Sequence, residues 1–264
     1  MEKVWLIRYS EIGIKGKNRR LFEKRLASNI KTCLEKEGIS HHKISILHGR
    51  IIVFGDEGLG VLKRVFGIQS FSPSFRCPLS VEEIGNFATS FVRGASSFCV
   101  RAQRLDKEFL PTPEIERKVG AFIFQSTGVR VDLKSPSVRV GIEVFSGFAH
   151  VFFERIEGFG GLPVGIEGRA CLIVEDERSV LAGLLMLRRG CALTLFFKNN
   201  LDASILERFS YGAAIKTTPF IPEDMIAVFG GNVDSAIEGK HSQPCFYPLV
   251  GFPLEKALEI ASYG

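Results

Sequence analysis

The sequence has no apolar run that reaches the ~18 residues of a membrane-spanning helix. None of its six cysteines are spaced as Cys-x-x-Cys, and its five histidines do not follow a metal-binding spacing. The cysteines lie mostly in apolar runs, which is typical of buried thiols rather than of a zinc or disulfide framework. The N-terminus also has no signal-peptide core. We therefore expect a cytoplasmic protein with no membrane partner and no bound metal ion.

The composition is that of an ordinary globular protein, with 45% apolar and 24% charged residues among 264. This length is enough for two or three small domains. The net charge is +5, and residues 1–25 alone contain eight basic and three acidic side chains. The whole positive surplus therefore lies at the N-terminus, a pattern expected of a protein that contacts a phosphate backbone.

Three domains are predicted, at residues 1–78, 79–168 and 169–264. The first has the order βαββαβ of a ferredoxin-like fold, with elements at Trp5–Arg8, Arg19–Glu37, Lys43–Leu47, Ile51–Phe54, Leu59–Phe66 and Phe71–Phe75. The second has helices that start at the Ser80 capping box and at Thr112, and strands at Phe98–Arg101, Val131–Leu133, Val138–Phe145 and Ala149–Phe153. We expect Asp132 and Glu143 to pair with neighbouring cations.

In the third domain strands and helices alternate, which predicts a parallel α/β sheet. Its elements are expected at Cys171–Val174, Val180–Arg189, Ala192–Phe197, Ala203–Phe209, Met225–Phe229, Phe246–Val250 and Pro253–Ala261. The fold class is therefore α+β for the first two domains and α/β for a reduced, Rossmann-like third domain.

A basic segment, Tyr9–Arg20, connects the first strand to the first helix. Gly13 and Gly16 free its backbone, and Asn18 can cap the helix that follows. Lys15, Lys17, Arg19 and Arg20 supply positive charge that suits phosphate oxygens. The alternative is a solvated basic turn that binds nothing.

Several segments resemble the tRNA 4-thiouridine synthetase family, the tRNA sulfurtransferases. They are YSEIGIKGKNR at 9–19, GGLPVGIEGRA at 160–170 and the closing PLVGFPLEKALEIASYG. The second domain, with its F-x-V-R, R-L-D-K and E-x-x-R-K-V-G patterns, resembles a THUMP domain. The resemblance implies that the first two domains grip the acceptor arm of tRNA. By position in these motifs, it makes Arg101, Arg104 and Lys107 binding candidates, with Arg117 and Lys118 as weaker ones.

The turn Glu175-Asp176-Glu177-Arg178-Ser179 departs from that family, which has an ATP-binding Ser-Gly-Gly-x-Asp-Ser loop here. A phosphate cradle needs glycines and free N–H groups, whereas this turn offers three carboxylates. We expect one of them to cap the following helix; the alternative is that they hold a divalent cation. The stretch Gly230–Ser235 looks like the missing loop, but too little chain follows it for a nucleotide domain of the usual order. The domain is therefore predicted to be a degenerate PP-loop domain without a cofactor.

The leading hypothesis is a tRNA-binding protein that has lost ATP-dependent catalysis, since Cys245 is the only late cysteine and is expected to be packed. Its third domain would serve a tRNA-modifying partner enzyme or a homodimer, because a shortened sheet exposes a strand edge. One alternative is an active tRNA sulfurtransferase that uses ATP and Mg²⁺. The other is a structural or oligomerising protein that binds no RNA.

Overall fold

The computed structural model describes residues 2–9, 11–40, 43–47, 49–55, 58–238 and 243–263. The chain forms two compact units, and each is assembled from separate stretches of sequence. Unit 1 comprises residues 1–8, 40–57 and 70–156, and unit 2 comprises residues 9–39, 58–69 and 157–264. The three domain boundaries given above stay predictions. No helix among the described residues is long and apolar enough to cross a membrane.

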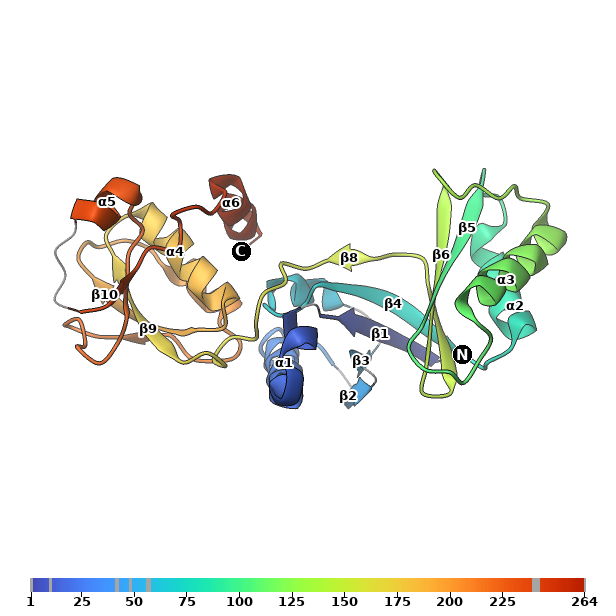
Figure 1. The fold of residues 1–264 in the computed structure, drawn as a ribbon, viewed down its shortest axis with the longest axis horizontal. Helices are drawn as coiled ribbons and strands as arrows, with labels where there is room; N and C mark the ends of the chain where they lie inside the picture. The colour runs from blue at the N-terminus through green and yellow to red at the C-terminus, as the bar shows by residue number, and fades with distance from the viewer. Residues whose placement is uncertain are drawn as a thin grey trace. The chain divides into compact units, whose positions relative to one another are not determined.

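Unit 1 is built on a sheet with the strand order β2-β3-β1-β4-β7-β6-β5 (Figure 1). The strands are β1 (Glu2–Arg8), β2 (Lys43–Leu47), β3 (Arg50–Phe54), β4 (Ser70–Cys77), β5 (Phe98–Arg104), β6 (Val138–Phe145) and β7 (Phe148–Phe152). Neighbours along this order are antiparallel except β5 and β6, which run parallel. The short strand β8 (Ile156–Glu157) follows.

Helices α2 (Val81–Val92) and α3 (Thr112–Thr127) cover one face of β5 and β6 (Figure 1). The Ser80 hydroxyl accepts a hydrogen bond from the Glu83 N–H at 3.3 Å, so the predicted capping residue is confirmed. Alternate residues of β6, such as Val140 and Val144, are fully buried in one core cluster with residues of both helices. The intervening residues of β5 and β6 belong to the opposite face of the sheet.

The predicted hairpin between β6 and β7 is present. Ser146 and Gly147 both have positive φ, at 52° and 76°, as a two-residue hairpin turn requires. The strand expected at Val131–Leu133 is wrong, because only one isolated bridge joins Val131 to Phe98. The Asp132 carboxylate accepts the N–H groups of Lys134 and Ser135, both at 2.9 Å, instead of the ion pair that we expected.

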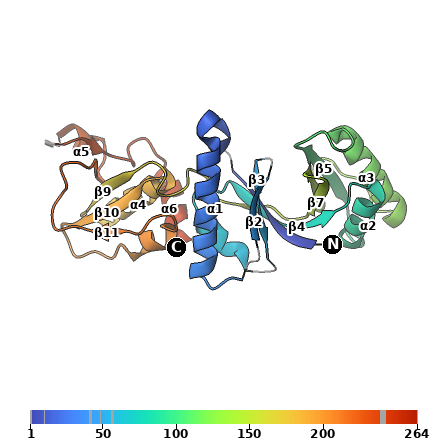
Figure 2. The same cartoon turned by 90° about the horizontal axis from the view of Figure 1, so that it is seen from below.

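Unit 2 contains a parallel sheet in the order β11-β10-β9-β12-β13, as predicted for an α/β domain. Figure 2 labels β9, β10 and β11 of this sheet. Its strands are β9 (Arg169–Val174), β10 (Ala192–Phe197), β11 (Lys216–Thr217), β12 (Ala227–Val228) and β13 (Cys245–Phe246). The last two are shorter than expected, because pairing with the neighbouring strands is limited to two residues. Helices α4 (Glu177–Arg188), α5 (Val233–Glu238) and α6 (Leu254–Ser262) complete this part.

The rest of unit 2 comes from the N-terminal third of the chain. It consists of η1 (Glu11–Ile14), η2 (Gly16–Asn18), helix α1 (Arg19–Lys36) and η3 (Leu59–Arg64). The helices expected at Leu59–Phe66 and Ala203–Phe209 are 3-10 turns, the second being η4 (Ser204–Phe209). Helix α4 is the centre of this unit, since every residue from Ser179 to Leu187 is buried.

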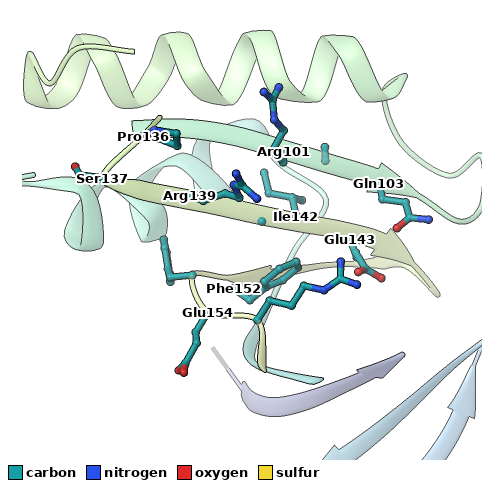
Figure 3. A pocket seen from close by; sticks show the side chains of 13 residues that line it. Arg101, Gln103, Pro136, Ser137, Arg139, Ile142, Glu143, Phe152 and Glu154 are labelled. Atoms are coloured by element: carbon teal, nitrogen blue, oxygen red, sulfur yellow. The ribbon is translucent and has the colours of Figure 1, made fainter. Parts of the chain in front are cut away.

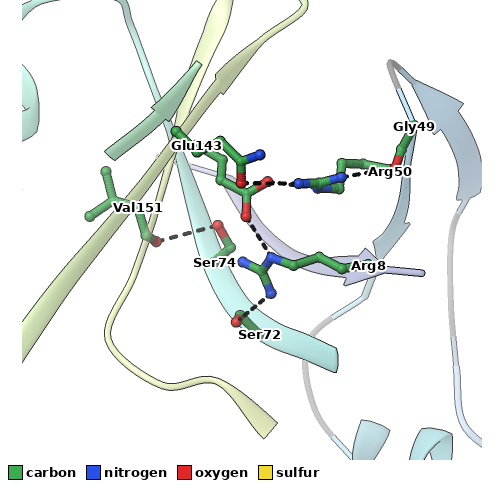
Figure 4. Close-up of polar contacts among 8 residues, drawn as sticks. Arg8, Gly49, Arg50, Ser72, Ser74, Glu143 and Val151 are labelled. Atoms are coloured by element: carbon green, nitrogen blue, oxygen red, sulfur yellow. Dashed lines mark hydrogen bonds and ion pairs between the residues drawn. The ribbon is translucent and has the colours of Figure 1, made fainter. Parts of the chain in front are cut away.

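A buried carboxylate joins three strands of unit 1 (Figure 4). Glu143 on β6 receives the Arg8 Nε at 2.5 Å and the Arg50 Nε at 2.7 Å, which confirms the expected pairing with cations. Arg8 also donates to the Ser72 hydroxyl on β4 at 3.0 Å. Because Arg8 and Glu143 are almost fully buried, removing either partner would leave an uncompensated charge in the interior.

Next to Glu143 in the sheet, His150 is buried and stacks on Phe145 with ring centroids 4.1 Å apart. Burial lowers the pKa of His150 from 6.5 to about 4, and the nearby Arg76 adds to the shift. Between these two pKa values the unfolded chain binds more protons than the folded protein. Stability therefore falls as the pH decreases through this window.

We predict that His150 lowers the free energy of unfolding by about 2 kcal/mol when the pH drops from 7 to 5. His150→Phe keeps the stacked ring and removes the titrating group. Urea unfolding at both pH values should show a smaller loss of stability in this variant than in the natural protein. An equal loss in both proteins would contradict a neutral, buried His150.

Candidate nucleic-acid interface

The basic segment contains two 3-10 turns, η1 and η2, which lie immediately before helix α1 and carry Lys17 and Asn18. Gly16 has φ of 52°, so the glycine is needed for this backbone. Asn18 is the N-cap residue of α1, but its side chain makes no capping hydrogen bond. The Asn18 amide is exposed and therefore free to contact a ligand.

The predicted cations of this segment divide into two groups. Lys15 pairs with Glu167 at 3.2 Å, and Arg19 pairs with Glu23 at 2.8 Å. Lys17 and Arg20 are exposed, and neither has a hydrogen bond or ion pair within the described part of the chain.

Arg19 belongs to a small internal network. Its guanidinium contacts the Tyr9 hydroxyl at 3.2 Å, and that hydroxyl donates to Glu23. Burial raises the pKa of Tyr9 to about 12, and the Glu23 carboxylate adds to the shift. Arg19 is therefore engaged in holding the start of α1, which leaves Lys17 and Arg20 as the available charges.

In unit 1, the face of the sheet opposite the helices carries a cavity of about 530 Å³ (Figure 3). Gly141 on β6 has no side chain, and a Cβ there would lie 2.3 Å from the Phe152 ring. Because Gly141 has no side chain, the Phe152 ring can pack directly against the backbone of β6. Charged and polar lining residues are Arg101, Gln103, Ser137, Arg139, Glu143, Glu154 and Arg155.

Arg101 also lines a second cavity of about 390 Å³ beside α3, together with the predicted Arg117. The Arg101 guanidinium donates to the Leu133 carbonyl at 2.9 Å, which fixes it at the edge of the sheet. The exposed side chains of Phe124, Val131 and Leu133 make this second cavity largely apolar.

The other predicted residues of this domain have different surroundings. Arg104 donates to the Phe109 carbonyl at 2.9 Å and so braces the loop after β5. Lys107 in that loop is exposed, and Lys118 pairs with Glu114 at 3.2 Å. Neither Arg104 nor Lys107 lines the two cavities described above.

Sequence reasoning missed Arg139 and Arg155, which line the larger cavity with Arg101. The available signal was the alternation along β6, which assigns Arg139, Gly141 and Glu143 to one face. Nothing in the sequence showed that the two helices leave this face uncovered.

At the end of β9, the turn at Glu175–Ser179 caps α4 as predicted. The Asp176 carboxylate accepts the Ser179 N–H at 2.8 Å, and the Ser179 hydroxyl accepts the Asp176 N–H at 3.2 Å. Glu175 pairs with Lys198. No group of three or more metal-ligating side chains occurs within the described ranges. Backbone N–H groups at the start of α4 are thus already bonded to side chains of the same turn.

The loop after β12 covers the same helix start. A Cβ added to Gly230 would lie 2.3 Å from the Ser179 nitrogen, and the Arg178 Nε donates to the Gly230 carbonyl at 3.1 Å. In a doubly wound sheet, ligands bind at the strand ends where the strand order reverses, which here is between β9 and β12. Here the Gly230 backbone lies against the start of α4.

Comparisons with known proteins agree with this architecture. A model of the ThiI ferredoxin-like domain matches residues 4–72, and a model of the THUMP domain matches residues 83–154. A probable tRNA sulfurtransferase of Methanocaldococcus jannaschii is 37% identical over 207 residues, which cover 72% of this chain and 54% of the relative.

Two solved structures extend the likeness to the third domain. PH1313 from Pyrococcus horikoshii is 30% identical with a TM-score of 0.84, covering 99% of both chains. A 4-thiouridine synthetase in complex with RNA and bound ATP is 26% identical with a TM-score of 0.77, covering 100% of this chain and 85% of that one. The matches define a THUMP-domain protein that carries a ThiI ferredoxin-like domain. The chain belongs to the tRNA sulfurtransferase family, and it spans about half the length of the curated relatives it matches.

We predict that Gly230→Ala destabilises the protein by about 1–3 kcal/mol, because the new methyl group would meet the backbone at Ser179. Gly60→Ala is the matched control, since a Cβ there has no atom within 4 Å. Urea unfolding of both variants checks this. Equal stability of the two variants would mean that Gly230 does not press on the start of α4.

Proposed function

We propose that this protein binds tRNA and holds the acceptor arm through phosphate and sugar contacts. The observation that carries the proposal is the pair of exposed cations, Lys17 and Arg20, that no carboxylate neutralises within the described residues. Asn18 lies between them and adds a hydrogen-bonding amide. Phosphate contacts of this kind position RNA without reading its sequence.

The uncovered face of the THUMP domain provides the second set of contacts. Arg101 and Arg139 lie on neighbouring strands, and Arg155 lines the same cavity. The Glu143 carboxylate in this lining is balanced by Arg8 and Arg50, so the cavity keeps a net positive charge. This charge favours phosphate oxygens.

We further propose that the third domain does not carry out ATP-dependent catalysis. The Asp176 cap neutralises the helix start, and the Gly230 backbone occupies the space before it. A triphosphate would meet the carboxylates of Glu175 and Glu177 there. Burial raises the pKa of the Cys245 thiol, which disfavours the thiolate that sulfur transfer requires.

The third domain would instead bind a second copy of the chain or a tRNA-modifying partner enzyme in the cytoplasm. Leu254 and Leu258 lie one turn apart on α6 and are 39% and 51% exposed. Exposed apolar side chains gathered on one helix are typical of a docking surface. The two-residue edge strands β11 and β13 offer little backbone for pairing, so α6 is the better candidate.

We predict that bulk tRNA binds with strong salt dependence and that ATP with Mg²⁺ leaves the affinity unchanged. The Lys17→Gln/Arg20→Gln double variant should weaken binding and reduce the salt slope by about 1.4–1.8, since each phosphate contact contributes about 0.7–0.9. Fluorescence titrations at several salt concentrations measure both quantities.

Lys31→Gln is the control for this experiment. Lys31 is an exposed cation of helix α1, which also contains Arg20, but it already pairs with Glu35 at 3.6 Å. Its substitution should leave the salt slope unchanged. If the natural protein fails to bind tRNA at low salt, the proposed function is wrong.

The second candidate is an active tRNA sulfurtransferase, which is favoured by the family itself. A structural neighbour of this chain is a 4-thiouridine synthetase with RNA and bound ATP. The two functions differ in one measurable product. We predict no tRNA-dependent release of pyrophosphate from ATP, and release at the rate of an active enzyme would establish the second function.

A further inference from the structure

The segment that precedes the third domain is fixed to the end of α4. The N–H groups of Gly165, Ile166 and Glu167 all donate to the Gly190 carbonyl, at 2.8, 3.0 and 3.1 Å. Gly190 has φ of 90°, and a Cβ there would lie 3.1 Å from the Glu167 Cγ. The turn that ends α4 therefore lies directly against Glu167.

The same segment is fixed to α1 and to the basic segment. Asn29 donates to the Val164 carbonyl at 3.1 Å, and the Lys15 ammonium pairs with Glu167 at 3.2 Å. Lys15 also lies over the Phe22 ring, 4.7 Å from its centroid. Glu167 thus has the basic segment on one side and the end of α4 on the other, and all these groups belong to unit 2.

Arg189, immediately before Gly190, is exposed at this junction. Its backbone N–H donates to Leu185 at 2.9 Å, but its side chain has no partner within the described residues. The adjacent Arg188 differs, since its Nε donates to the Phe159 carbonyl at 2.7 Å. Burial raises the pKa of the Cys191 thiol. The Glu167 carboxylate adds to this rise, and the Arg189 guanidinium opposes it.

We propose that Arg189 is a further phosphate-binding residue, which adds a cation of the third domain to the available cations Lys17 and Arg20 of the basic segment. This inference rests on the proposed binding of tRNA. Glu167 holds the Lys15 ammonium beside the end of α4, and Arg189, the residue before Gly190, adds an exposed guanidinium next to the turn that ends this helix. A guanidinium can bind a phosphate group through two parallel hydrogen bonds.

The competing explanation is that Arg189 only stabilises the negative C-terminal end of the α4 dipole. That role would affect the stability of the protein and leave its affinity for tRNA unchanged. The two explanations therefore differ in whether substitution of Arg189 changes the salt dependence of binding.

The test is a set of tRNA titrations between about 50 and 200 mM salt with the full chain. We expect Arg189→Gln to weaken binding roughly threefold to tenfold and to lower the salt slope by about one. Arg189→Lys should restore the slope because it restores the charge. Lys216→Gln is the control, since Lys216 is an exposed cation on the edge strand β11 and should not contribute.

Each outcome separates the inference from the proposed function. If the natural protein binds tRNA and Arg189→Gln binds with the same slope, the Arg189 inference is overturned while the proposed function stands. If Lys216→Gln lowers the slope equally, the effect is one of net charge and the inference is also overturned. If the natural protein does not bind tRNA, both the function and the inference fail.

Discussion

The carboxylate of Glu143 is the constraint on which unit 1 depends. Burying it is costly, and two guanidinium groups from different strands offset that cost. The arrangement aligns β1, β3 and β6 at one place in the sheet. It also offsets the charge of the Glu143 carboxylate in the lining of the larger cavity. Arg8 and Arg50 are thus used inside the protein, whereas Arg139 in the cavity lining is exposed.

Within the described residues, the basic segment in unit 2 likewise contains both paired and unpaired cations. Lys15 and Arg19 are held by Glu167 and Glu23, whereas Lys17 and Arg20 are exposed. A count of positive charges in the sequence treats all four alike. Pairing distinguishes cations that stabilise the fold from cations that can exchange water for phosphate, and only the latter release counterions on binding.

Local features were the most predictable from the sequence. The caps at Ser80 and in the turn at Glu175–Ser179 depend on residues within three positions, and the hairpin at Ser146 depends on its turn. The pair of Lys15 with Glu167 joins residues 152 positions apart, and no local pattern indicates it. The exposure of Arg139 depends on which face the helices cover, and this is a property of the folded domain.

The contact between Gly230 and the start of α4 links two segments that are about 50 positions apart in the chain. The loop at Gly230 packs against the turn at Glu175–Ser179, so a change in one of them alone disturbs its packing against the other. Inserting a glycine-rich loop at Glu175–Ser179 would leave the Gly230 backbone in the way, and moving Gly230 would leave a carboxylate at the helix start. On the proposal that the third domain lacks a nucleotide site, restoring such a site would require both segments to change together, because the Gly230 backbone is fitted to the turn that caps α4.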